Sequence, residues 1–420
     1  MADVTLVLFH APVPRDAGTL TALHGRARDL LLERHVVMFR AAGVDRVVVT
    51  RGRSAPRPAG AAAAGAAAPP DGSAPADASF GDALAAVVRD ERVGACIVLS
   101  DGAVPLAGPS DARALVDAAR SPLPLALTNN RYSSDVCAIS DAAVLRDLPA
   151  LPSDNVLPRW LEEVAGVPVR ELGARERLAI DLDTPLDLAI VALAPRCPAS
   201  LRNLASGAGV SIPRLDALRE LAGDPHRELL VMGRSSSRTL AWLERHVRCR
   251  VRFLAEERGL RASSPLAIAP DTGGSSEGSA TRPSRASQAP RAPRASQGPR
   301  APRATLGRLL ARDGAASLAR HVADLADGAV LDSRVLLADR AGADEDAWPV
   351  AEDRFASDLL RPDGIADPWL RDLTASAAGA PIPILLGGHT LVGPGIPLLL
   401  RPTARRPRTP RSPGRTRALR

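Results

Sequence analysis

The chain has 420 residues and a formal net charge of +7 at pH 7, and all of its basic residues are arginine. This length allows two or three domains, each with a core of its own. Two segments, Pro270 to Thr305 and Arg401 to Arg420, carry +4 and +8, so the rest of the chain is net −5. Because the excess positive charge lies in these segments, we do not expect nucleic-acid binding to be the function of the folded part.

The four cysteines lie far apart without a C-x-x-C pair. This pattern argues against a zinc knuckle and against a dense set of disulfides. No segment combines a basic start with a long apolar run, and no apolar stretch has the length needed to cross a bilayer. We therefore expect a cytoplasmic protein with no membrane partner.

Apolar runs and amphipathic segments alternate over the first 195 residues, which predicts an α/β domain with a mostly parallel sheet and flanking helices. We expect strands at Val4 to Phe9, Asp45 to Thr50, Ala95 to Leu99, Leu123 to Thr128, Asp135 to Ser140 and Leu178 to Asp183. Helices are expected at Thr21 to Ala42, Asp82 to Arg89, Ser110 to Ala119, Asn155 to Ala165 and Thr184 to Leu193. Residues 54–79, mostly Ala, Pro and Gly, predict a mobile surface loop.

The second half also alternates, which predicts a second α/β domain formed by residues 199–268 and 306–400. Its expected elements are strands at Glu228 to Met232, Arg250 to Leu254 and Ala329 to Leu337, helices at Ser236 to Val247, Leu306 to Ala326 and Pro368 to Ala378, and an apolar run at Ile382 to Leu386. Residues 270–305 contain the repeat RASQAPRAP, RASQGPRAP, which has no bulky apolar side chain and predicts a disordered insert. Residues 401–420 predict a disordered basic tail.

Three segments of the first half carry a family resemblance. They are H-A-P-V-P from His10, L-S-D-G-A-V-P-L from Leu99 and I-D-L-D-T-P-L-D-L from Ile180. These segments resemble K-A-P-V-P-G-R, G-D-x-P-L and D-I-D-T-P-E-D-L of the MobA-like NTP transferases, nucleotidyltransferases related to the GT-A glycosyltransferases. The third match is the most specific, because paired acids, a helix cap and a following helix agree. The resemblance implies a Rossmann-like nucleotidyltransferase fold for residues 1–195.

The resemblance also implies a metal site. Nucleotidyl transfer uses a divalent cation, Mg²⁺ or Mn²⁺, to neutralise the triphosphate, and such cations take carboxylate oxygens. By the resemblance, Asp101 and Asp183 are catalytic metal ligands, and Asp181 is a further ligand. Both Asp101 and Asp183 are expected at strand ends, where a parallel sheet can bring distant acids together.

The loop after the first strand is expected to bind the nucleotide through Ala11 and Pro12. The lysines of the family are absent there, so Arg15 and Arg26, or Arg28, would supply the positive charge. The residues between two expected strands predict either an acceptor-binding loop or an ordinary polar turn. They are Asn129, Asn130, Arg131, Tyr132 and Asp135.

We therefore expect a nucleotidyltransferase whose partners are a nucleoside triphosphate and a phosphorylated or sugar-like small acceptor. A nucleotide-sugar glycosyltransferase and a catalytically silent nucleotide-binding or scaffold protein are the alternatives. In the second half, Gly233 to Arg238 lies between an expected strand and helix, so it either holds an anion or caps the helix. Other polar groups there are interpreted as solvated faces or surface ion pairs. They are Glu256 to Gly259, Asp332 to Arg334, Glu352 to Arg354 and Gly387 to His389.

Overall fold

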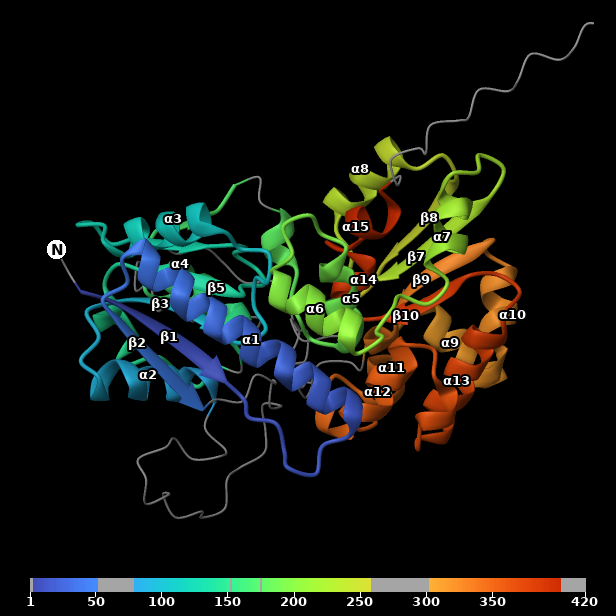
Figure 1. Ribbon diagram of the computed structural model, residues 1–420, viewed down its shortest axis with the longest axis horizontal. Coiled ribbons are helices and arrows are strands. Elements are labelled where there is room, and N and C mark those ends of the chain that lie inside the picture. Colours follow the sequence, from blue (N-terminus) through green and yellow to red (C-terminus); the bar gives the residue numbers. More distant parts are fainter. Residues whose placement is uncertain (1–2, 52–78, 152, 174–175, 258–301, 402–420) are drawn as a thin grey trace, which may run out of the picture.

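Two β-sheets, each flanked by helices, organise the chain in the computed structural model (Figure 1). The structure describes residues 3–51, 79–151, 153–173, 176–257 and 302–401. The expected loop at 54–79, the insert at 270–305 and the tail at 401–420 therefore lie almost wholly outside the described residues. None of the helices in the described ranges is both long and apolar enough to cross a membrane.

The first sheet has six strands in the order β2-β1-β3-β5-β4-β6. The strands are β1 Val4–His10, β2 Arg46–Arg51, β3 Ala95–Ser100, β4 Ala126–Thr128, β5 Val136–Ile139 and β6 Val169–Glu171. Strand β5 runs antiparallel to both of its neighbours, β3 and β4. The sheet is therefore mixed, which corrects the expectation of a mostly parallel one only at this strand.

Helices cover both faces of this sheet. The helices on its faces are α1 Thr19–Ala42, α2 Phe80–Asp90, α3 Pro109–Ala119 and α4 Leu157–Glu163, whereas α5 Pro185–Ala192 and α6 Ala199–Gly207 pack against α1. The side chains of β1 alternate between two cores, since Val7 packs with Leu84 of α2 while Leu6 packs with Phe39 of α1. Burial on both faces explains why β1 and β3 are continuous apolar runs.

The second sheet has four strands in the order β10-β9-β7-β8, all parallel. The strands are β7 Glu228–Gly233, β8 Arg250–Ala255, β9 Gly328–Asp332 and β10 Ile384–Gly387. The helices around it are α7 Leu215–Ala222, α8 Ser237–His246, α9 Thr305–Asp313, α10 Leu318–Ala323, α11 Ser333–Ala341, α12 Ala351–Asp358, α13 Pro368–Gly379, α14 His389–Val392 and α15 Ile396–Leu400.

Helix α5 joins the two halves because it packs into both. Leu186 and Ile190 belong to the core of the second sheet, whereas Leu188 and Val191 pack in a cluster with residues of α1 and α6. A second contact is made at the start of the long helix α1, which reaches α12 of the second half (Figure 1).

Two expected strands were wrong in whole or in part. Leu178 to Asp183 begins in a 3-10 helix, Glu176–Ala179, and continues as an irregular segment. Its alternating buried residues Leu178, Ile180 and Leu182 imitate a strand, but Leu182 N donates to Gly102 O in a loop rather than in a ladder. The expected strand at Ala329 to Leu337 ends at Asp332, because the Asp332 side chain caps helix α11.

Candidate functional site

Asp101 lies directly after β3 and is 1% exposed. Its Oδ2 accepts a hydrogen bond from Ala11 N at 3.2 Å and lies 2.7 Å from Nδ1 of His10. Its Oδ1 lies 3.5 Å from Nη1 of Arg28, whose Nη2 donates to Ala11 O at 2.9 Å. The Asp101 carboxylate is thus bound through both oxygens and holds the loop after β1 in place.

The second acidic segment runs beside this loop. Leu182 N donates to Gly102 O at 2.9 Å, and a Cβ on Gly102 would lie only 3.0 Å from Leu182 O. The residues on either side of Leu182 are Asp181 and Asp183, so the two acidic segments named from the sequence are neighbours.

His24 of α1 lies against both acidic segments. It is hydrogen-bonded to Leu182 O through Nε2 at 2.8 Å. Burial and the positive charge of Arg28 lower the pKa of His24, and the charges of Asp183 and Asp101 oppose that shift. The imidazole is therefore neutral near pH 7.

Four aspartates form what we call the carboxyl cluster: Asp135, Asp154, Asp181 and Asp183. Burial is the main cause that raises the pKa of Asp135 to about 6 and that of Asp154 to about 7. Burial and then the charges of Asp135 and Asp183 raise the pKa of Asp181 well above its ordinary value. The interaction between the Asp135 and Asp181 side chains lowers the pKa of Asp135 and raises that of Asp181. Asp183 is exposed.

The donor chemistry of the carboxyl cluster fits a hard divalent cation, which takes oxygen ligands. Oδ1 of Asp181 is buried and has no hydrogen-bond partner among the described residues. Across the described ranges, however, no three His, Cys, Asp or Glu side chains are grouped so that they could already hold a metal ion. Asp135, Asp181 and Asp183 therefore supply potential carboxylate ligands that are not already arranged around one metal position. The carboxylate of Asp101, by contrast, is bound by other groups of the protein.

In the loop between β4 and β5, one residue belongs to the candidate site and the others stabilise the loop. Oδ1 of Asn129 accepts from Asp135 N at 3.0 Å, and its Nδ2 donates to Leu178 O at 2.8 Å and to Asp135 Oδ2 at 2.5 Å. Asn129 thus closes the turn and orients Asp135, which is the member of the expected acceptor loop that joins the carboxyl cluster.

The remaining residues of that loop face elsewhere. Asn130 Oδ1 accepts from Tyr132 N at 3.0 Å. Arg131 donates from Nη2 to Val169 O at 2.9 Å and pairs through Nη1 with Glu162 at 2.9 Å. The Tyr132 side chain is 59% exposed. These contacts are those of a structured surface turn.

The expected nucleotide-binding residues are also separated. Ala11 contacts Asp101 and Arg28, but Pro12 and Arg15 are exposed in the loop after β1, and Arg26 is exposed on α1. Residues two positions apart on a helix do not share a face. Arg28, not Arg26, is therefore the cation of α1 at this site.

The sequence did not identify His24 or Asp154 as members of this site. Asp154 begins a 3-10 helix that folds back toward the β4–β5 loop, where Ser133 Oγ donates to Asn155 Oδ1 at 2.8 Å. Nothing in the local spacing indicates this approach. The helix cap in the D-L-D-T-P-L-D segment is confirmed, since Thr184 Oγ1 accepts from Asp187 N at 3.1 Å and donates to Asp187 Oδ2 at 3.0 Å.

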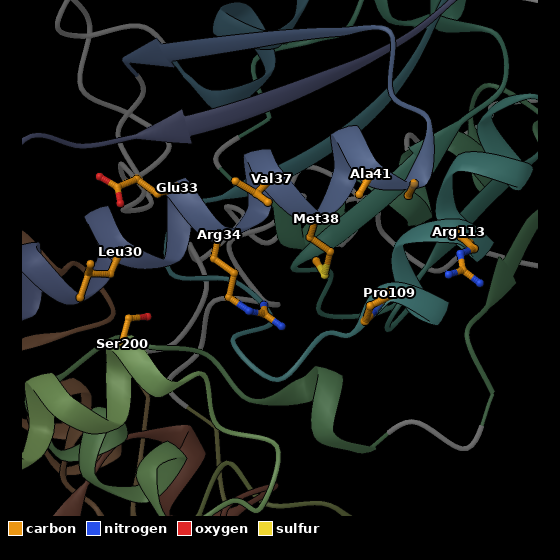
Figure 2. Close-up of a pocket in the computed structure, with 10 residues that line it drawn as sticks. Leu30, Glu33, Arg34, Val37, Met38, Ala41, Pro109, Arg113 and Ser200 are labelled. Carbon is orange, nitrogen blue, oxygen red and sulfur yellow. The ribbon is translucent and has the colours of Figure 1, made fainter.

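A cavity of about 510 Å³ lies elsewhere, between the outer face of α1 and the starts of α3 and α6 (Figure 2). Its lining is mostly apolar and contains none of the carboxyl cluster. Because charged ligands and cations need polar partners, we place the candidate site at the carboxyl cluster and not in this cavity.

No protein-family model matches the chain, and no curated protein matches it at a significant level.

Proposed function

We propose that the chain is a relative of the MobA-like NTP transferases that binds a nucleoside triphosphate with Mg²⁺ or Mn²⁺ at the carboxyl ends of β1 and β3. It would transfer the nucleoside monophosphate to a phosphorylated or sugar-like small acceptor. The observation that supports this best is the pairing of Leu182 with Gly102, which sets the segment of Asp181 and Asp183 beside that of Asp101.

Each group has a role in the proposed reaction. Asp181 and Asp183, with Asp135, would hold the cation, and a bound cation neutralises charge on the triphosphate. Asp101 positions the loop after β1 through His10 and Ala11. An acceptor oxygen attacks the α-phosphorus, the bond from that phosphorus to the bridging oxygen breaks, and pyrophosphate leaves with the electron pair.

A second candidate is nucleotide binding without transfer. It is favoured by one observation: both oxygens of Asp101, an expected metal ligand, are bound by protein groups. In this case the nucleotide would stabilise the protein, but no pyrophosphate would be released with any acceptor.

Thermal unfolding with ATP, GTP, CTP and UTP, each with and without Mg²⁺, tests the site. A ligand at about 100 times its Kd adds about 2.7 kcal/mol to the free energy of unfolding. We expect Mg²⁺-dependent stabilisation that is lost in Asp181→Asn and Asp183→Asn. Asp147→Asn, at an exposed acid outside the cluster, is the matched control. Nucleotide stabilisation that survives both cluster substitutions would remove the assignment, and pyrophosphate release separates transfer from binding alone.

A further inference from the structure

The second sheet reverses its strand order between β7 and β9. From β7 the chain crosses to β8 on one side, and from β9 it crosses to β10 on the other. In parallel α/β sheets, ligands bind outside the carboxyl ends of the strands at such a reversal. We call this place the switch-point edge and define it by Gly233, Arg234, Asp332 and Gly388.

The switch-point edge faces the carboxyl cluster of the first sheet. Thr390, just after β10, donates from Oγ1 to Asp181 O at 3.2 Å. Burial opposes ionisation of Arg234, but the charges of Asp332 and then Asp183 raise the pKa of its guanidinium. Residues of both sheets therefore border one region.

The Arg234 guanidinium is held in a fixed orientation. Its Nε lies 2.6 Å from Asp332 Oδ2 and its Nη2 lies 3.2 Å from Oδ1 of the same side chain, which is wholly buried. Nη1 makes no hydrogen bond with the residues that the structure describes, and this nitrogen is not fully buried. Since the side chain is 23% exposed, this nitrogen can donate to a ligand.

Glycines leave room beside this guanidinium. Gly233 has a φ of +129°, and a Cβ there would lie 2.1 Å from Asp332 Cβ, so no side chain fits. A Cβ on Gly388 would meet only Arg234 Nη2, at 3.8 Å. Gly233 therefore lets the end of β7 approach Asp332 closely, and Gly388 places no side chain over the guanidinium.

Helix α8 begins at the same edge. Ser236 caps it by accepting from Thr239 N at 3.3 Å, and Ser236 and Ser237 are exposed. Ser235 Oγ donates to Val392 O at 2.6 Å, which anchors the loop between β7 and α8. The first N–H groups of a helix stabilise a nearby anion, and so do the N–H donors of an arginine guanidinium.

We infer that the switch-point edge is an anion-binding subsite centred on Arg234 Nη1 that takes the phosphate or carboxylate group of the acceptor. The role of the anion as acceptor rests on the proposed function. An acceptor anchored there would reach toward Asp181 and Asp183, where the nucleotide is proposed to bind. This explains why the second sheet packs against the candidate site.

Calorimetric titration of the full chain with inorganic phosphate tests the subsite. Arg234→Gln alone would leave Asp332 buried without its partner, so the test variant is the double substitution Arg234→Gln with Asp332→Asn. The matched control is Arg252→Gln, because Arg252 pairs with Glu228 at 3.0 Å near the opposite end of the same sheet. We expect about 10- to 100-fold weaker phosphate binding in the double variant, as for loss of a charge-assisted hydrogen bond, and no change in the control.

Two outcomes overturn the inference. The first is phosphate binding that is absent in the native chain or equal in the double variant, with the fold checked by circular dichroism. The second is competition between phosphate and Mg²⁺-nucleotide, which would assign the subsite to the nucleotide. The phosphate titration needs no nucleotide, so failure of nucleotide binding would count against the proposed function alone.

Discussion

Asp101 and Asp183 were expected to play the same role, but their surroundings differ. Asp101 is buried and bound by His10, Ala11 N and Arg28, whereas the Asp183 side chain is exposed. We predict that Asp101→Asn lowers the free energy of unfolding by about 1 to 3 kcal/mol, because it removes the charge that Arg28 faces and weakens the hydrogen bond from Ala11 N. Asp183→Asn should change it by less than about 0.5 kcal/mol. Urea unfolding measures both, and equal effects would contradict the description of Asp101 as a positioning residue.

The carboxyl cluster predicts an unusual pH dependence. Asp135 and Asp154 have pKa values of about 6 and about 7 in the fold, above the ordinary value of 3.8, so the folded chain holds more protons than the unfolded chain between these values. The contribution of the cluster to stability is therefore present below about pH 4 and is lost as the pH rises through about 7.

Asp181→Asn should reduce this loss, because an amide can donate to Asp135 without adding charge. At about pH 8 and without divalent cations we expect the variant to be more stable than the native chain by roughly 1 to 3 kcal/mol, since each pKa unit corresponds to about 1.4 kcal/mol. Melting temperatures measured from acid to mildly alkaline pH provide the comparison. Parallel curves for the two proteins would show that the aspartates do not repel one another.

Only some of the residues at the candidate site could be identified from the sequence. The backbone of the Asp101 segment lies beside that of the Asp183 segment, although the second segment is not a strand. The membership of Asp154 and His24 could not be predicted, because each reaches the site through a fold-back or a helix face that depends on tertiary packing. Likewise, only the structure separates Arg28, which faces Asp101, from the exposed Arg26.

At the scale of elements, the N-terminus of helix α1 is capped by a side chain from another helix. Glu352 of α12 accepts from Leu20 N and Thr21 N, both at 2.9 Å, and from Thr21 Oγ1 at 2.8 Å. Gly18 permits this contact, since a Cβ there would lie 2.2 Å from Glu352 Cδ. A carboxylate at a helix N-terminus is favourable, and the cap here also links the two halves of the chain.

We predict that Glu352→Ala costs about 1 to 2 kcal/mol, as for loss of an N-cap. Burial opposes the shift, but the hydrogen bonds from Leu20 and Thr21 lower the pKa of Glu352 below 4.5. The contribution is thus present above about pH 4.5 and is lost as the pH falls through the lowered pKa. Guanidinium unfolding at neutral and acid pH measures it, with the exposed Glu220→Gln as control. A cost that does not shrink in acid would contradict the cap.

Most long elements were predictable because burial imposes either a continuous apolar run, as in β1 and β7, or a helical spacing of apolar residues, as in α1 and α13. Strand β6 was missed because a strand of three residues is too short to show an alternating pattern of apolar and polar residues. Leu178 to Asp183 was wrong for the opposite reason, since alternate burial arises there without a neighbouring strand. The direction of β5 depends on strand pairing, which no local pattern reports.

For the whole molecule, the sequence predicted that the first domain ends at residue 195 and that the second begins at residue 199, just after α5. In the structure α5 contributes Leu186 and Ile190 to the second core, and Leu20 of α1 also packs there. The apolar pattern of α5 indicated that the helix is buried, but it could not indicate which of the two cores the helix packs against. The two sheets therefore share a helix, and we expect them to unfold together.

Ile190→Ala tests this cooperation, because Ile190 is fully buried in the second core while its helix also packs on the first half. We predict a loss of about 2 to 5 kcal/mol, the usual cost of such a truncation. Fluorescence of Trp160 in the first half and of Trp242 in the second, each kept as the sole tryptophan, should report the same shifted transition. Leu193→Ala, at a more exposed position just after the same helix, should change stability by less than about 0.5 kcal/mol. A shift of the Trp242 transition alone would mean that the halves unfold independently, and then the contacts between Thr390 and Asp181 would not suffice to hold one composite site together.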